Sequence, residues 1–193
     1  MDNPILACIK TRRSVRRYTE EPVSREHLDA LLEAAVWAPS GSNNQSWLFT
    51  AIRGKTVLAR LNETVRQTFL TWTPDDDYPA KRGAVKKATS EGYCFFYNAP
   101  LLIIASNKPG YQNAMADCSL ALQNIFLAAH SLGLGTCWVN QLRWLRAEKP
   151  VRQFLAGLGL PEEHEICCAA AVGHPAHTPP APERRSGTTL IVE

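Results

Sequence analysis

Residues 113–140 read "NAMADCSLALQNIFLAAHSLGLGTCWVN". The apolar residues that recur at helical spacing in its first part are Met115, Cys118, Leu122, Ile125, Phe126 and Ala129. A stripe of this width predicts a long central helix, from Asn113 to Leu132, that is buried along most of its length. The second part, "GLGTCWVN", is bounded by glycine and predicts a short strand.

Three other runs have the composition of strands. The runs "NAPLLIIAS" (98–106) and "HEICCAAAVG" (164–173) are almost continuously apolar, which is typical of strands buried on both faces. The run "WLFTAIR" (47–53) is rich in aromatic and β-branched residues, which favour extended backbone. We therefore expect these three runs to form strands alongside "GLGTCWVN".

Capping residues and prolines mark two helices near the N-terminus. Asn3 and Pro4 predict the start of a short helix that carries "ILACIKTRR". Ser24 predicts the cap of a second helix, which Pro39 must end because proline cannot continue a helix. The first of these helices delivers a group of arginines at its end.

Two further helices and one long loop are expected in the rest of the chain. Apolar spacing predicts helices from Lys55 to about Leu70 and over "LRAEKPVRQFLAGLG" (145–159). Residues 71–87, "TWTPDDDYPAKRGAVKK", are polar, charged and interrupted by two prolines. We therefore expect the region 71–90 to be a mobile loop or lid.

Length and composition are those of one globular domain. The chain has 193 residues, of which 45% are hydrophobic and 20% charged, so we expect residues 1–193 to form a single domain. The net charge of only +3 argues against a nucleic-acid-binding surface. The best apolar run, 99–106, is about half of the roughly 20 residues that cross a membrane. The N-terminus "MDNPILACIK" lacks the features of a secretion signal, so we expect a cytoplasmic location.

The chain has no recognisable set of protein groups for catalysis. Its six cysteines show neither a C-x-x-C pair nor zinc-site spacing, so we expect reduced thiols and no metal. These cysteines are Cys8, Cys94, Cys118, Cys137, Cys167 and Cys168. No G-x-S-x-G, H-E-x-x-H, P-loop or G-x-G-x-x-G motif is present. An enzyme built on this chain therefore needs a cofactor to carry its chemistry.

Positive charge is concentrated in "TRRSVRRYTEEPVS", residues 11–24. Guanidinium groups bind phosphate through paired hydrogen bonds, and a serine hydroxyl adds one more donor. The residues of this candidate phosphate site are Arg12, Arg13, Ser14 and Arg16. The alternative is a solvated helix end, where cations meet the negative pole of the helix dipole. Taken alone, the cluster favours the second interpretation.

A second candidate is the loop "WAPSGSNNQSW", residues 37–47. Its small residues let the backbone approach a flat ligand closely, while Asn43 and Gln45 supply amide donors and acceptors. The alternative is an ordinary turn that uses serine, glycine and asparagine for their backbone conformations.

Three separated motifs, in this order and spacing, resemble the FMN-dependent nitroreductase-like flavin oxidoreductases. They are "RRSVRRY" (12–18), "APSGSNNQSW" (38–47) and "DCSLALQNIFLAAHSLGLGTCWVN" (117–140), followed by "AAAVGHPA" and an arginine-containing tail. The resemblance covers nearly the whole chain. It implies an α+β, three-layer fold in which helices flank a mostly antiparallel central sheet. It also implies a homodimer with two FMN sites at the interface and an exchanged C-terminal arm.

The resemblance implies which residues bind the phosphate and the pyrimidine side of FMN. The matching residues near the N-terminus are Arg12, Arg13, Ser14 and Arg16, whereas Arg17 is left to solvent. In the tail, Arg185 matches the basic residue that meets the phosphate, with Arg184 as the competing register. Glu183 stands where the family commonly has lysine, which is a departure from its pattern.

Other residues are implied to lie against the flavin ring. Those of the small-residue loop, which approaches from the other subunit, are Pro39, Ser40, Gly41, Asn43 and Gln45. Ser46 stands where the family often has proline. The backbone at Asn140 and Gln141 corresponds to the position nearest flavin N5.

The implied activity is hydride transfer from NADH or NADPH through flavin N5 to a nitroaromatic, quinone or enone acceptor, by a ping-pong mechanism. No protein residue is implied as catalytic, and neither nucleic acid nor a membrane is an expected partner. One alternative keeps the fold and FMN but performs flavin fragmentation, reductive dehalogenation or ring oxidation. Another is a non-catalytic, flavin-binding redox sensor.

The tail, residues 174–193, is rich in proline and ends in a β-prone apolar segment. Such an arm fits a segment that reaches across the sheet of a second subunit. The alternative is a frayed terminus.

Overall fold

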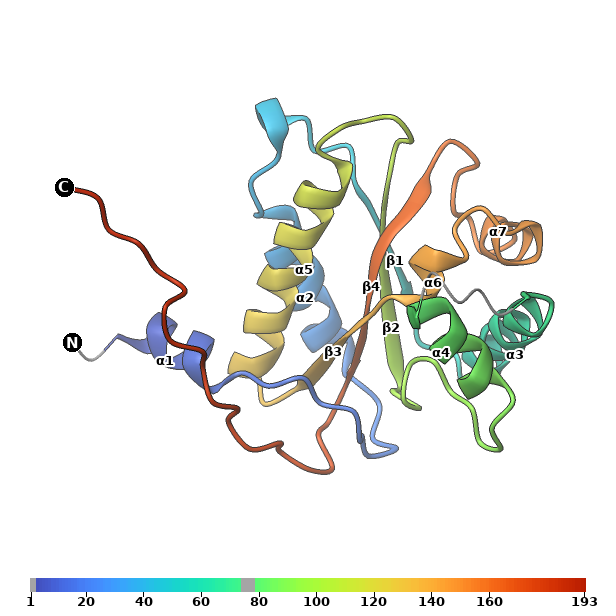
Figure 1. Ribbon diagram of the computed structural model, residues 1–193, viewed down its shortest axis with the longest axis horizontal. Helices are drawn as coiled ribbons and strands as arrows, with labels where there is room; N and C mark the ends of the chain where they lie inside the picture. Colours follow the sequence, from blue (N-terminus) through green and yellow to red (C-terminus); the bar gives the residue numbers. More distant parts are fainter. Residues whose placement is uncertain (1–2, 74–78) are drawn as a thin grey trace.

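Within residues 3–73 and 79–193, which the computed structural model describes, four strands form one sheet in the order β1-β2-β4-β3 (Figure 1). The strands are β1 (Leu48–Ile52), β2 (Leu101–Asn107), β3 (Gly135–Val139) and β4 (Glu165–Gly173). All three neighbouring pairs are antiparallel. Each strand lies inside or within one residue of a run predicted from the sequence, so those strand predictions are confirmed.

Helices cover both faces of this sheet and give the molecule three layers (Figure 1). One face carries α2 (Arg25–Val36) and α5 (Ala114–Ser131). The other carries α3 (Lys55–Leu70), α4 (Pro79–Ala88), α6 (Gln141–Trp144) and α7 (Lys149–Ala156). Along β2, Leu101 and Ile103 belong to the first core and Leu102 and Ile104 to the second, as the alternation of side chains along a strand requires. The three-layer α+β fold is therefore confirmed.

The central helix α5 agrees with its prediction to within one residue at each end. Its side chains at helical spacing are buried against α2 and the sheet. One member of the buried face is an acid, Asp117, whose residue is only 3% exposed. An acid is rarely so buried unless it is paired, so its partners bear on function.

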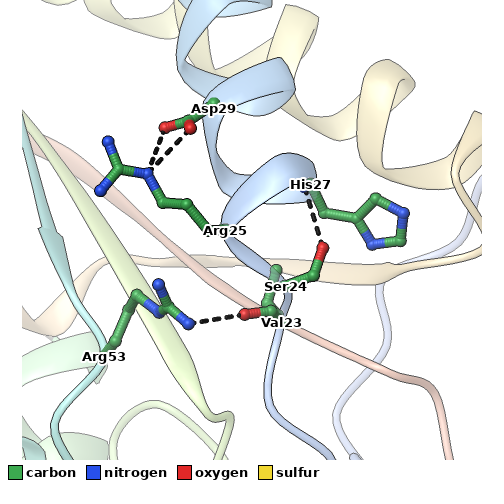
Figure 2. Close-up of polar contacts among 6 residues, drawn as sticks. All are labelled: Val23, Ser24, Arg25, His27, Asp29 and Arg53. Atoms are coloured by element: carbon green, nitrogen blue, oxygen red, sulfur yellow. Dashed lines mark hydrogen bonds and ion pairs between the residues drawn. The ribbon is translucent and has the colours of Figure 1, made fainter.

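The start of α2 shows how local polar contacts fix a helix end (Figure 2). Ser24 Oγ accepts a hydrogen bond from the His27 amide at 3.0 Å, which confirms the predicted cap. Arg25 and Asp29, one turn apart, form an exposed ion pair at 2.8 Å. Arg53, just after β1, donates to the Val23 carbonyl at 3.0 Å and ties this helix start to the sheet.

The expectation of a loop over residues 71–90 is wrong for its second half, because α4 occupies Pro79–Ala88. Proline is tolerated in the first turn of a helix, where its missing N–H has no partner to lose. Ala84 and Ala88 are buried, and the Ala88 carbonyl accepts a hydrogen bond from Arg66 Nε of α3 at 2.9 Å. Packing on α3 therefore stabilises a helix that polarity and prolines conceal. Residues 74–78 of the expected lid lie outside the described residues.

The helix predicted over 145–159 is shorter in the structure. α7 begins at Lys149 and has Pro150 in its first turn, so the helix cannot extend further toward the N-terminus. The short α6 precedes it, directly after β3.

The first helix, α1 (Pro4–Thr11), begins at the predicted cap, since Asn3 Oδ1 accepts from the amides of Ile5 and Leu6. In the described part of the chain, no helix is both long and apolar enough to cross a membrane.

Candidate functional site

The arginine-rich segment lies along the edge strand β3. Ser14 forms a parallel bridge with Thr136, and the Val15 amide donates to the Thr136 carbonyl at 2.9 Å. Gly135 makes this approach possible, because a Cβ atom there would lie 2.8 Å from the Val15 side chain. The segment is thus docked on the sheet, and its arginines are held at fixed positions.

Arg12 is half-buried in a strongly positive environment. Its guanidinium lies 5.9 Å from the centre of the Phe126 ring. Burial, followed by the charge of Arg13, lowers the pKa of Arg12, and Arg184 of the tail adds to the same effect. Across residues 3–73 and 79–193, no carboxylate forms an ion pair with Arg12 or Arg184. The arrangement therefore offers paired donors to an anion that the chain itself does not supply.

Arg16 faces a different set of groups from Arg12. Its guanidinium lies 5.9 Å from the centre of the Tyr97 ring, and a hydrogen bond to Tyr97 raises the pKa of Arg16. The Cys137 thiol of β3 lies beside both residues, and burial raises the pKa of this thiol. Tyr97 has a φ of 60°, a left-handed conformation that non-glycine residues rarely adopt. Such backbone conformations persist where the surrounding structure holds them, often at functional sites.

Arg13 is used locally. Its Nη1 donates to the carbonyls of Lys10 and Arg12 at 2.7 and 2.8 Å. These bonds satisfy the end of α1, where a cation is favourable. At least part of the Arg13 guanidinium therefore caps the end of α1. This agrees with the alternative interpretation of the cluster as a helix end.

The end of β3 leads directly into α6, where Asn140 and Gln141 lie. Trp138 Nε1 donates to Asn140 Oδ1 at 2.6 Å. The Tyr93 hydroxyl donates to Gln141 Oε1. Burial raises the pKa of Tyr93, so this hydroxyl keeps its proton and remains a donor. Both predicted residues are thus held at the sheet edge that carries the arginines.

The tail begins beside the arginine-rich segment. The Thr19 amide donates to the His174 carbonyl at 2.9 Å, and the Ala176 amide donates to the Arg17 carbonyl at 3.0 Å. Further along, Arg184 is the tail residue whose charge acts on Arg12.

The small-residue loop lies elsewhere, at the N-terminal end of α5 (Figure 1). The Gly41 amide donates to Asp117 Oδ1 at 3.1 Å. At the opposite end of α5, His130 Nε2 contacts Thr11 Oγ1 at 2.8 Å, next to the arginines. Thirteen residues of helix separate Asp117 from His130, which is roughly 20 Å at ~1.5 Å per residue. One chain therefore brings the arginines and the end of β3 together but leaves the loop far away.

The sequence did not predict the residues that contact and hold the candidate site residues. They are Tyr93, Tyr97, Asn107, Tyr111 and Asp117. One signal was available, since Asp117 is the single acid within the apolar stretch 114–131. Among the described residues, no group of three or more His, Cys, Asp or Glu side chains could hold a metal ion.

Comparisons with known proteins agree with this fold. The family model described as "Nitroreductase family" matches residues 9–174. A solved nitroreductase with bound FMN from Bacteroides fragilis is 39% identical, with full coverage of both chains and a TM-score of 0.90. A second nitroreductase with bound FMN, from Desulfitobacterium hafniense, is 29% identical with full coverage of both chains and a TM-score of 0.87.

A relative from Archaeoglobus fulgidus, whose name describes an NADH dehydrogenase/NAD(P)H nitroreductase, is 30% identical over 173 residues. The match covers 88% of this chain and 84% of the relative. The fold is that of FMN-dependent oxidoreductases. The chain belongs to the nitroreductase family.

Proposed function

We propose that this protein is an FMN-dependent oxidoreductase that uses NADH or NADPH to reduce small-molecule acceptors. The observation that carries the proposal is Arg12, which is half-buried at the sheet edge among the charges of Arg13 and Arg184 and forms no ion pair with a carboxylate of the described residues. Such a donor set fits a phosphate ester. The FMN bound to the two solved structures described above supports the same conclusion.

When bound, FMN supplies a ring that accepts hydride from the nicotinamide and passes electrons on to the acceptor. The chain's own residues bind FMN and orient its ring. Arg12, Ser14 and Arg184 are the proposed phosphate ligands. Arg16, held by Tyr97, supplies positive charge beside the ring, which favours an anionic reduced flavin. Within this proposal no side chain acts as a catalytic acid or base.

The end of β3 is proposed to face the reactive part of the ring. Tyr93 holds the Gln141 side chain, and Trp138 holds that of Asn140, so the backbone between them is fixed. A fixed backbone at this point orients the ring and limits the approach of water.

We further propose that the functional unit is a homodimer with an exchanged tail. The loop of residues 39–45 lies too far from the arginines of its own chain to reach the same ring, so a second copy must supply it. Trp37, next to that loop, is 77% exposed, and the tail residues 190–192 are 82–89% exposed. Apolar surfaces of this kind are expected to be covered by a partner. The arginines of one chain and the loop residues of the other thus join in one site only in the assembly.

The acceptor class is part of the proposal. Relatives named 4-nitrobenzoate reductase, from Pseudomonas putida and a Nocardioides species, support a nitroaromatic acceptor. Quinones and enones are the other candidates. A cytoplasmic location is also proposed, because the free cysteines fit a reducing compartment that supplies NAD(P)H.

A spectrum of the purified protein, before and after anaerobic addition of NADH or NADPH, tests the proposal. We expect a yellow protein whose flavin absorbance bleaches with at least one nicotinamide and returns on addition of 4-nitrobenzoate or a quinone. A protein that stays colourless after incubation with FMN refutes the function. Flavin that binds but bleaches with neither nicotinamide favours the specialised or sensing alternatives.

A further inference from the structure

The loop that follows α2 is held in an unusual backbone conformation. Ser42, Asn43 and Gln45 have φ values of 52°, 53° and 48°. Non-glycine residues adopt this left-handed region only where surrounding contacts hold them there. Three such residues within four positions therefore require anchors outside the loop.

The first anchor is the buried carboxylate of Asp117. Its Oδ1 accepts from the Gly41 amide at 3.1 Å, and its Oδ2 accepts from the Tyr111 hydroxyl at 3.0 Å. The same hydroxyl lies 3.2 Å from the Gly41 carbonyl. A hydroxyl has one hydrogen, and the charged oxygen is the stronger acceptor. Asp117 thus holds the Gly41 amide directly, and the Tyr111 hydroxyl holds the other oxygen of the same carboxylate.

Gly41 is the residue that makes this contact possible. A Cβ atom there would lie 2.2 Å from Asn113 Nδ2 and 2.7 Å from the Tyr111 hydroxyl. A side chain at position 41 would therefore displace the Asn113 and Tyr111 side chains.

The second anchor holds the other end of the loop. Ser46 Oγ donates to Oδ1 of Asn107 at 2.8 Å, and Asn107 is fully buried at the end of β2. Between the anchors, the Gln45 amide donates to Ser40 Oγ at 3.0 Å.

We propose that Asp117 is a positioning residue for the cofactor: through the Gly41 peptide and Tyr111 it fixes the loop of residues 39–45 in the shape that meets a flavin held by a second copy of the chain. This inference rests on the proposed function. In this proposal the carboxylate touches neither the cofactor nor the substrate. It restricts the conformations of the loop before FMN binds. Pre-organisation of this kind raises affinity by reducing the entropy lost on binding.

The hydrogen bonds of Asp117 with Gly41 and Tyr111 predict which substitution of Asp117 preserves the loop. In Asp117→Asn the amide oxygen still accepts from Gly41, and the amide nitrogen donates to the Tyr111 oxygen. The Tyr111 hydroxyl is then free to donate to the Gly41 carbonyl, so the Gly41 amide keeps its acceptor and only the contact with Tyr111 exchanges donor and acceptor. Asp117→Ala removes both bonds to the carboxylate and leaves the Gly41 amide without its acceptor.

The test compares full-length Asp117→Ala, Asp117→Asn and a matched control, Asn124→Ala. Asn124 donates to the Ala34 carbonyl at 2.9 Å, so the control also removes a hydrogen bond made by α5 but does not touch the loop. Two quantities are measured: the Kd for FMN, by quenching of flavin fluorescence, and the amide exchange rate of Gly41 without FMN.

We expect Asp117→Ala to raise the Kd for FMN at least tenfold and to speed Gly41 exchange at least tenfold. Asp117→Asn should stay within about threefold of wild type in both, and Asn124→Ala should change melting temperature alone. The inference is overturned if Asp117→Ala binds FMN as tightly as Asn124→Ala, or if Gly41 exchanges at the wild-type rate. If wild type binds no FMN, the proposed function fails, and the exchange rate still decides whether Asp117 holds the loop.

Discussion

Replacing Arg12 by alanine is expected to weaken FMN binding without a matching loss of protein stability. Arg12 is half-buried at the sheet edge, and Arg13 and Arg184 are the nearby cations that lower its pKa. Without an anion, these three charges repel one another. With a phosphate between them, the guanidinium groups bind the anion and no longer destabilise one another.

The expected loss of affinity follows from the energy of a charged hydrogen bond. Such a bond contributes about 1.5–3 kcal/mol, which corresponds to a roughly 10- to 150-fold rise in the Kd for FMN. The stability of the apoprotein depends on two opposing effects. Loss of the contact with the Phe126 ring costs about 0.5–1 kcal/mol, and relief of repulsion from Arg13 and Arg184 offsets it. The free energy of unfolding should therefore change by less than about 1 kcal/mol.

The assay titrates apoprotein into FMN at two ionic strengths and follows flavin fluorescence. Arg17→Ala is the control, because this exposed arginine belongs to the same segment but is not a proposed ligand. At 0.1 M salt the screening length is about 10 Å, so general attraction weakens with salt whereas direct contacts weaken less. A Kd for Arg12→Ala within twofold of wild type, or equal losses for Arg12→Ala and Arg17→Ala, would refute the phosphate assignment.

Three further predictions concern stability, assembly and titration. Gly83→Ala in α4 should raise the free energy of unfolding by about 0.5–1 kcal/mol in a urea titration, because nothing lies within 4 Å of the new Cβ; an unchanged or lower value contradicts the α4 assignment. Deletion of residues 188–193 should convert dimer to monomer in sedimentation velocity and release FMN, and an intact dimer would argue against the exchanged tail. Burial, with the charges of Arg12 and Arg13, holds the pKa of His130 below its ordinary 6.5. This pKa should rise in Arg12→Ala in an NMR titration, and an unchanged value would place Arg12 too far away to act.

The His130 shift also predicts how stability depends on pH. A histidine with a lowered pKa binds fewer protons when folded than when unfolded, so it destabilises the fold as pH falls below about 6.5. Apoprotein is therefore expected to lose stability below this pH, and His130→Gln should remove that part of the loss.

Elements whose burial is encoded locally were predictable from sequence. The stripe of α5 and the apolar run of β2 each reveal their packing within a few residues, and both elements appear where they are expected. The helix α4 was not predictable, because its stability depends on α3 burying Ala84 and Ala88 and on a bond from Arg66. Its own sequence shows only charge and proline.

In the candidate site, too, some residues could be predicted from the sequence and others could not. The arginines and the loop are contiguous motifs, so a resemblance could find them. Their supports are not contiguous: Asp117 lies 76 residues from Gly41, and Tyr93 lies 48 residues from Gln141. A single sequence carries no signal for such pairs beyond an acid that interrupts an apolar stripe.

The docking of the N-terminal segment on β3 has a consequence for how the chain is made. Thr11 meets a partner 119 residues further on, and Thr19 meets the first residue after β4. During synthesis the segment must wait until nearly the whole polypeptide has emerged, and contacts of such long sequence separation are slow to form. The first arginines to leave the ribosome are thus among the last residues to reach their places. A chain interrupted before β3 and β4 lacks the sheet edge on which this segment docks, so its arginines have no fixed place.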